Sequence, residues 1–147
     1  ILEGNYFYSH NFKPERWPAG NPETGYLNTD GSPTKTEILN LNRLGENESY
    51  WNYAFGKRAQ EELYDVKKDP QCLENLANKE EFFKIKKDLK DKMMNDLIEQ
   101  GDPRVMGKGD IFDQYPYSGE KVKNFYTRFM NGEEIPTHWV NTSDFEQ

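Results

Sequence analysis

The sequence is poor in the residue types on which enzyme active sites most often depend. Its 147 residues include one cysteine, Cys72, and two histidines, His10 and His138. A single cysteine excludes an internal disulfide, and two distant histidines without patterned carboxylate neighbours give a catalytic triad little material. The chain also lacks an HExxH helix, a CxxC pair and a phosphate-binding glycine loop. We therefore expect no catalytic residue within this chain.

The sequence also lacks an excess of basic charge and long apolar runs. Its net charge is -7, which argues against a nucleic acid partner because phosphate binding needs a concentrated basic face. No apolar run approaches the roughly 20 residues of a membrane-spanning helix, so we expect no membrane insertion. Hydrophobic residues make up only 34% of the chain, so its nine Phe, nine Tyr and three Trp must supply much of the core.

Alternation and turn residues predict a small sheet. Residues 5–12 alternate between two faces, with Tyr8 and His10 on the same one, which predicts a strand. Residues 3–5, Glu-Gly-Asn, are the expected hairpin turn before it, since Gly and Asn tolerate positive φ. The run EELYDV, residues 61–66, predicts a further strand. The aromatic run YWNYAFGKRAQ, residues 50–60, shows no periodicity and is expected to be irregular.

Capping signals and helical periodicity predict the helices. Ser32 and Pro33 are typical of an N-cap and a first helical position, and Gly45 is expected to end that short helix. The longest helix is predicted from Asn78, which forms a capping-box-like pair with Glu81, to about Gln100. One apolar stripe on this helix is expected to pack on the sheet, and it consists of Phe82, Ile85, Leu89, Met93 and Leu97.

The long helix also carries five lysines, Lys84, Lys86, Lys87, Lys90 and Lys92. A groove for an anionic glycan is one interpretation of them. The interspersed acids favour a solvated helix face instead, with i,i+4 ion pairs expected between Glu80 and Lys84 and between Asp88 and Lys92.

These elements together predict an α+β fold in which a small antiparallel sheet packs against a long C-terminal helix. A last short helix over residues 122–130 is expected to end at Gly132, and residues 133–147 are expected to form an extended tail. We therefore predict a domain of residues 1–132 followed by that tail. Asp110 and Asp113 have a spacing found in some metal loops, but they lack the further oxygen ligands of a calcium site, so turn and cap chemistry is favoured.

The run EELYDVKKDPQCLENLAN, residues 61–78, resembles the C-terminal signature of the formylglycine sulfatases, in which ELYD, DP and NLA follow at about these distances. AFGKRAQ, which precedes it, is similar to an AFGKRP-type segment of many bacterial members, although Ala59-Gln60 replaces the usual Pro-Ala. The segments YFYSHNFKPERWPAGNPETGY, DGSPTK and GDPRVMGKGDIFDQYPY resemble bacterial proteins similar to heparan N-sulfatase (N-sulfoglucosamine sulfohydrolase). The resemblance covers residues 6–117.

The resemblance implies that the chain is the C-terminal subdomain of a sulfatase that hydrolyses sulfate esters or sulfamates of a sulfated carbohydrate. Its partner would be its own N-terminal sulfatase domain, where a Cys-X-Pro-Ser-Arg motif yields formylglycine and calcium is bound. Cys72 is followed by Leu-Glu-Asn-Leu and does not match that motif. We therefore expect no cofactor in this chain, no activity of the chain alone, and a periplasmic or secreted location. A chain that opens within a strand is also expected to be part of a longer protein.

The loop from Ser9 to Gly20 is the candidate substrate contact. Cations and amides suit sugar hydroxyls and sulfate groups, and the candidate residues are His10, Asn11, Lys13 and Arg16, with Trp17 as a stacking face. The alternative is a polar strand end beside a Pro-rich loop that aromatic residues stabilise. A rival function, favoured by the aromatic content, is an autonomous, non-catalytic carbohydrate-binding or interaction module.

Overall fold

The computed structural model describes residues 1–24, 29–116, 123, 128, 131–134 and 142–144. The chain divides into two compact units. Unit 1 comprises Ile1–Pro14 and Ala59–Pro116, and unit 2 comprises Glu15–Arg58 and Tyr117–Gln147. The predicted helix over 122–130 lies outside the described residues except at positions 123 and 128. The predicted tail at 133–147 is described only in part, so the boundary at Gly132 stays a prediction.

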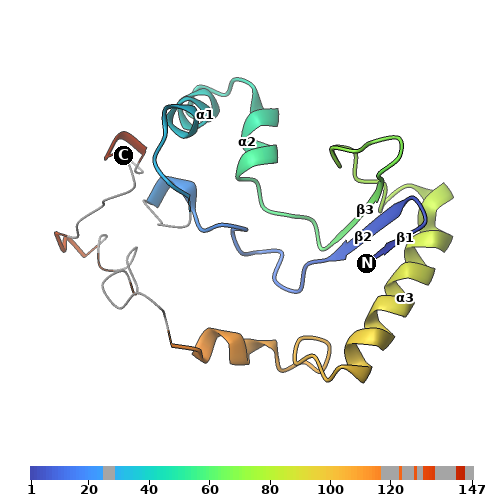
Figure 1. Cartoon of the computed structure of the whole chain (residues 1–147). Helices are drawn as coiled ribbons and strands as arrows, with labels where there is room; N and C mark the ends of the chain where they lie inside the picture. Colours follow the sequence, from blue (N-terminus) through green and yellow to red (C-terminus); the bar gives the residue numbers. More distant parts are fainter. Residues whose placement is uncertain (25–28, 117–122, 124–127, 129–130, 135–141, 145–147) are drawn as a thin grey trace. The chain divides into compact units, whose positions relative to one another are not determined.

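Unit 1 has a three-stranded antiparallel sheet in the order β1-β2-β3, which confirms the predicted α+β class (Figure 1). The strands are β1, Leu2–Glu3; β2, Tyr6–His10; and β3, Glu61–Asp65. The hairpin turn is confirmed, because Glu3 pairs with Tyr6 across a two-residue loop in which Gly4 has a φ of 59°.

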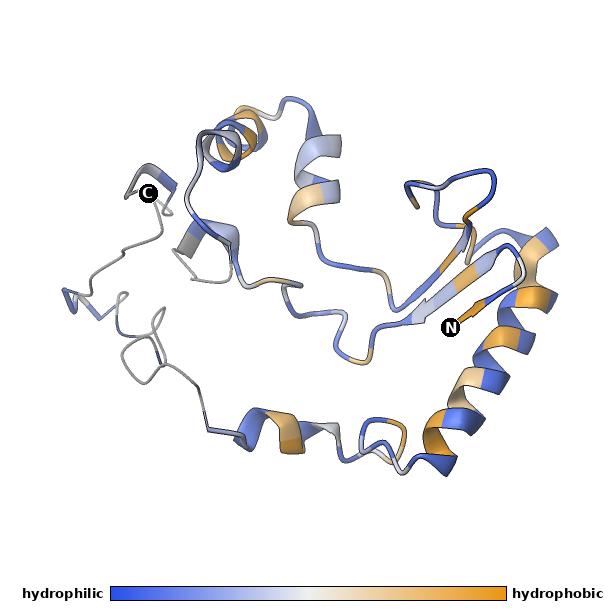
Figure 2. Ribbon diagram, in the orientation of Figure 1, coloured by the Kyte–Doolittle hydropathy of each residue, from blue (hydrophilic) through white to orange (hydrophobic). Residues whose placement is uncertain are grey.

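One long helix, α3, Phe83–Glu99, contacts the sheet through β2 and β3 side chains. Buried Leu89 joins a core cluster with Tyr8, Leu63, Leu76 and Ala77, and Phe82, Ile85 and Met93 pack against it half-buried. Figure 2 shows hydrophobic and hydrophilic residues alternating along α3, as expected for a helix with one buried stripe. The predicted stripe is thus confirmed at four of its members, and Leu97 is half-buried.

The start of the long helix differs from the prediction. The chain enters it through a 3-10 turn, η2, Glu80–Phe82, whose N-cap is Lys79 and not Asn78. Neither this turn nor α3 has a side-chain cap, so the predicted capping box is wrong. The predicted stop is confirmed, because Gly101 adopts a φ of 72° directly after the last turn.

The predicted ion pairs on the outer face of α3 are also wrong. The Lys84 ammonium lies 2.9 Å from the carboxylate of Asp88, so Lys84 pairs with the acid four residues after it and not with Glu80. Lys92 lies 3.8 Å from Asp96. Glu80 lies in the 3-10 turn, whose geometry differs from the regular helix on which the i,i+4 expectation depends.

Unit 2 contains two described α-helices. Helix α1, Pro33–Arg43, has the predicted N-cap, since the Ser32 hydroxyl accepts a hydrogen bond from the Lys35 amide at 3.1 Å. Helix α2, Glu48–Ala54, corrects the expectation of an irregular YWNYAF run. It is a two-turn helix whose first turn follows Asn47 in a left-handed conformation, with a φ of 48°. Short 3-10 turns lie at Pro22–Thr24 (η1), Gly109–Gln114 (η3) and Thr142–Asp144 (η5).

Among the described helices, none combines the length and the apolar character needed to cross a membrane. The longest of them, α3, has polar residues on most of its surface.

Candidate functional site

A cluster of charged and polar groups surrounds the carboxylate of Glu61 at the end of the sheet in unit 1. The Tyr8 hydroxyl donates a hydrogen bond to Glu61 Oε1 at 2.8 Å. The Lys90 ammonium lies 3.0 Å from the same oxygen, and the Lys86 ammonium lies 3.3 Å from Oε2. The fifth member is His10, whose Nδ1 lies 3.4 Å from the Tyr8 hydroxyl. We call these five residues the Glu61 cluster.

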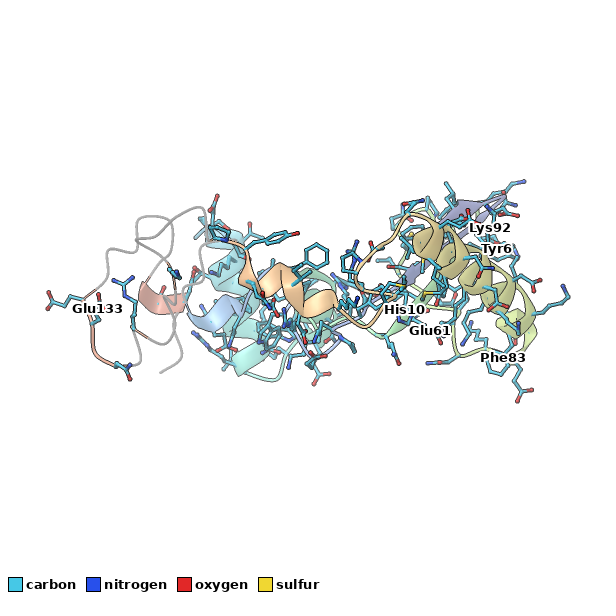
Figure 3. All side chains as sticks on the ribbon, turned by 90° about the horizontal axis from the view of Figure 1, so that it is seen from below. Tyr6, His10, Glu61, Phe83, Lys92 and Glu133 are labelled. Atoms are coloured by element: carbon cyan, nitrogen blue, oxygen red, sulfur yellow. The ribbon has the colours of Figure 1, made fainter. Side chains whose placement is uncertain are left out.

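The fold brings the Glu61 cluster together from three elements. His10, the last residue of β2, is the register partner of Glu61, the first residue of β3, and Figure 3 shows the two side by side. Tyr8 lies two residues before His10 and therefore on the same face of the sheet. Lys86 and Lys90 are four residues apart on α3, so one helix face presents both ammonium groups.

The surroundings determine the charge of the carboxylate. Burial raises the pKa of Glu61, but hydrogen bonds from Lys90, Tyr8 and Lys86 outweigh it and lower this pKa to about 2. Glu61 is therefore ionised at neutral pH. Burial, aided by the bond to Glu61 and its negative charge, raises the pKa of Tyr8, which stays a protonated donor.

His10 is neutral at neutral pH. Burial lowers its pKa below the usual 6.5, and the nearby charge of Lys90 lowers it further, against the opposing effect of Glu61. The ring also meets Phe12 edge to face, with centroids 4.8 Å apart. With two ammonium groups against one carboxylate, the Glu61 cluster carries one positive charge in excess.

The two lysines differ in their freedom. The Lys86 side chain is 18% exposed, and its ammonium also lies 5.1 Å from the centre of the Phe83 ring. Lys86 is therefore held between a carboxylate and an aromatic face. The Lys90 side chain is 39% exposed, so its ammonium meets solvent while it touches Glu61.

Of the predicted substrate residues, His10 belongs to the Glu61 cluster and Asn11 has a structural role. The Asn11 amide donates to the Ala59 carbonyl at 2.6 Å and to Glu62 Oε2 at 3.2 Å. These bonds join the end of β2 to the chain entering β3. This finding agrees with the alternative interpretation, a polar strand end, at Asn11.

The structure does not bring the other two candidates into the Glu61 cluster. Lys13 pairs at 2.7 Å with Asp110 of η3. Arg16 belongs to unit 2, whereas the other three candidates belong to unit 1. Trp17, the predicted stacking face, has the Lys57 ammonium 4.9 Å from its ring centre, and it meets Trp51 edge to face with ring centres 6.0 Å apart. One face of this indole is therefore already covered by a cation.

Lys86 and Lys90 were not among the site residues predicted from the sequence, although the sequence contains a signal for both. Lys84, Lys87 and Lys92 each have an aspartate four residues further on, whereas Lys86 and Lys90 have no acid three or four residues away on either side. On a helix, such lysines have no local partner and are available to a carboxylate from another element. The structure supplies that carboxylate as Glu61.

The ELYD to NLA run folds back on the strand that begins it. Asn75 Oδ1 accepts hydrogen bonds at 3.0 Å from the amides of Leu63 and Ala77, and its Nδ2 donates to the Glu61 carbonyl. Leu76 and Ala77 are thereby inserted into the core. The run thus fixes the backbone that carries Glu61.

Comparisons of the chain with protein-family models, with curated proteins and with solved structures found no match. Within the described ranges, no group of three or more His, Cys, Asp or Glu side chains is placed to hold a metal ion.

Proposed function

We propose that this chain is the C-terminal subdomain of a formylglycine-dependent sulfatase that acts on a sulfated carbohydrate, by hydrolysis of a sulfate ester or a sulfamate. It contributes packing against the catalytic domain and contacts at the rim of the substrate pocket, and it does not contribute the nucleophile. The observation that carries the proposal is the run of residues 61–78, whose order of motifs resembles the C-terminal signature of those enzymes.

The local structure of that run supports a structural role for its residues. Asp65 Oδ1 accepts hydrogen bonds at 3.2 Å from the amides of Lys67 and Lys68, which closes the turn after β3. Asp69 Oδ2 accepts from the Glu74 amide at 2.8 Å. The residues that resemble the signature therefore have internal hydrogen-bonding tasks, which is what an accessory subdomain requires of them.

The rim contact is assigned to the end of β2 and the loop that follows. His10 and Lys13 present a ring and a cation in unit 1, with Asn11 holding the strand end between them. Arg16 follows in the sequence as the candidate contact of unit 2. In the full-length protein, formylglycine and calcium belong to the N-terminal domain, so sulfate transfer takes place outside this chain.

The sequence of the reading frame upstream of Ile1, together with a turnover assay, tests the proposal. We expect a Cys-X-Pro-Ser-Arg motif several hundred residues before this chain, sulfate release by the longer protein and none by the 147-residue chain. Sulfate release by purified residues 1–147 would contradict the proposal. A reading frame without the motif, in a protein that still binds heparin fragments, would favour the autonomous carbohydrate-binding module instead.

A further inference from the structure

We propose that the Glu61 cluster is an anion subsite in which Lys90 and His10 bind the sulfo group of a sugar, and that His10 takes up a proton when the anion binds. This inference rests on the proposed function for its ligand class. It adds Lys90 to the candidate contacts and assigns Lys86 and Glu61 as positioning residues. The interpretation of the helix lysines as a solvated face gave Lys86 and Lys90 no such roles.

The Glu61 cluster has positive charge that a ligand can reach. Glu61 is shared between Lys86 and Lys90, and Lys86 is confined between that carboxylate and the Phe83 ring. Lys90 touches Glu61 with one part of an ammonium group that has three donors, and its side chain is 39% exposed. The two ammonium groups share one carboxylate, so the cluster has one positive charge in excess, and an anion meets that charge at Lys90, the more exposed of the two lysines.

The contact with Tyr8 determines which ring nitrogen of neutral His10 carries the proton. Because the Tyr8 hydroxyl donates its proton to Glu61, the same oxygen can only accept from Nδ1 of His10. The neutral ring then carries its proton on Nδ1 and a lone pair on Nε2. Among the residues that the structure describes, no group is hydrogen-bonded to Nε2.

Anion binding at this site is coupled to protonation of His10. A lone pair repels an anion, so a sulfo group beside Nε2 is bound only when this nitrogen gains a proton and becomes a donor. The polar and charged groups around His10 are Tyr8 from β2, Glu61 from β3 and Lys90 from α3, and Lys86 of α3 contacts Glu61. Lys90 disfavours the imidazolium in the free protein, and a bound anion offsets that effect. Anion binding and proton uptake therefore strengthen each other.

Ring-proton NMR of the histidines tests this coupling directly. The chain has only His10 and His138, so the second serves as an internal control. N-sulfoglucosamine is expected to raise the pKa of His10 and to leave that of His138 unchanged, with glucosamine inactive. Affinity should rise as the pH falls toward the lowered pKa of free His10, by at most about tenfold for each pH unit, because one proton is bound.

Matched lysine variants separate this site from a merely basic surface. Lys90→Met should weaken N-sulfoglucosamine binding about tenfold, the usual effect of losing one charge-assisted contact. Lys87→Met, which removes a lysine paired with Asp91 on the same helix, should change it less than about twofold. Lys90→Arg should keep most of the affinity, and His10→Gln should abolish the pH dependence.

Three results would overturn the proposal: no shift of the His10 resonance with ligand, equal effects of the Lys87 and Lys90 variants, or a response to glucuronate that equals the response to N-sulfoglucosamine. Failure of the proposed function is distinguishable. A reading frame without the sulfatase motif leaves a Lys90-dependent, proton-linked anion site intact, whereas a confirmed sulfatase whose KM is unchanged by Lys90→Met retains the proposed function without this subsite.

Discussion

The two units bury different kinds of groups. Unit 1 buries an apolar cluster of Tyr8, Leu63, Leu76, Ala77 and Leu89, and its one buried charge among the described residues, Asp65, binds backbone amides of the turn that follows it. In the described part of unit 2, by contrast, buried Leu39 is accompanied by Lys35 and Asp144, which are 3% and 0% exposed. Apolar burial depends on the amount of surface removed from water, whereas a buried charge depends on one particular partner.

The ionic part of unit 2 joins the N-terminus of α1 to η5. The Lys35 ammonium lies 3.8 Å from Asp144 Oδ2 and donates to the Thr29 carbonyl at 3.2 Å. The Thr36 hydroxyl donates to Asp144 Oδ1 at 2.7 Å. Arg43 donates to the Asp144 carbonyl at 3.0 Å. Unit 2 should therefore be more sensitive to the loss of a single polar partner than unit 1.

The largest expected effect is in the apolar core of unit 1. Leu63→Ala should lower the free energy of unfolding by about 4 kcal/mol, because Leu63 is 0% exposed and its removal leaves a cavity beside Tyr8 and Leu89. Chemical denaturation, with hydrogen exchange of the β2 and β3 amides as the probe, measures this decrease in the free energy of unfolding. Leu73→Ala, at a side chain that is half exposed, should cost less than about 0.5 kcal/mol. Equal losses in the two variants would show that the core is not where the structure places it.

The next effect is in the ionic contact of unit 2. Asp144→Ala should cost about 3 kcal/mol, because it leaves Lys35 buried without its charge partner. Trp17 and Trp51 belong to unit 2 and unit 1 contains no tryptophan, so tryptophan fluorescence during denaturation reports this unit. The exposed neighbour Ser143 provides the control substitution to Ala.

A double variant sharpens the contrast between the units. Lys35→Met with Asp144→Leu should recover most of the stability lost in Asp144→Ala, because apolar groups of similar volume replace a pair whose desolvation is costly. If the double variant were instead less stable than Asp144→Ala, the buried charges would be contributing net stability and the comparison with unit 1 would fail.

A smaller effect is expected at the cap of α1. Ser32→Ala removes the side-chain acceptor for the Lys35 amide and should cost about 1 kcal/mol. Thr34→Ala, at an exposed position in the same first turn, should leave stability nearly unchanged. Both variants are compared by tryptophan fluorescence in denaturant, and a similar loss in both would contradict the cap.

A pH-dependent effect is expected at Glu61 in unit 1. The folded pKa of Glu61 is about 2 against a usual 4.5, so its ionised form stabilises the fold above about pH 4.5. This contribution is lost as the pH falls from 4.5 toward 2. The stability difference between the natural chain and Glu61→Gln should therefore disappear over that interval, as thermal unfolding at a series of pH values will show. A difference that does not depend on pH would contradict the ionic role of Glu61.

Much of unit 1 was predictable from the sequence because its signals are local. Alternation gave β2, the Gly4 turn gave the hairpin, and spacings of three and four gave the buried face of α3. The entry to α3 was not predictable in this way, because a 3-10 turn replaces the expected capping box. Helix α2 was missed because its aromatic residues are exposed or half-buried and show no apolar period.

The candidate site was predictable only in part, because its geometry depends on contacts between distant elements. His10 was identified as a polar residue at a strand end, and it does belong to the Glu61 cluster. Glu61 and Lys86 are 25 residues apart in the chain, so no local pattern relates them. Asn11 was selected for its amide, but that amide is occupied by backbone and side-chain acceptors across the sheet.

The ring of Tyr8 links the hydrophobic core of unit 1 to its electrostatics. Its carbon atoms lie in the apolar cluster and its hydroxyl contacts both Glu61 and His10. A slip of β2 by a single residue would exchange the two faces of the strand, turning Phe7 inward and withdrawing the phenol from the carboxylate. A mispaired hairpin would therefore break the hydrogen bond from Tyr8 to Glu61 and also disrupt the apolar core. The hydrogen bonds of the Glu61 cluster thus form only when β2 has its correct register.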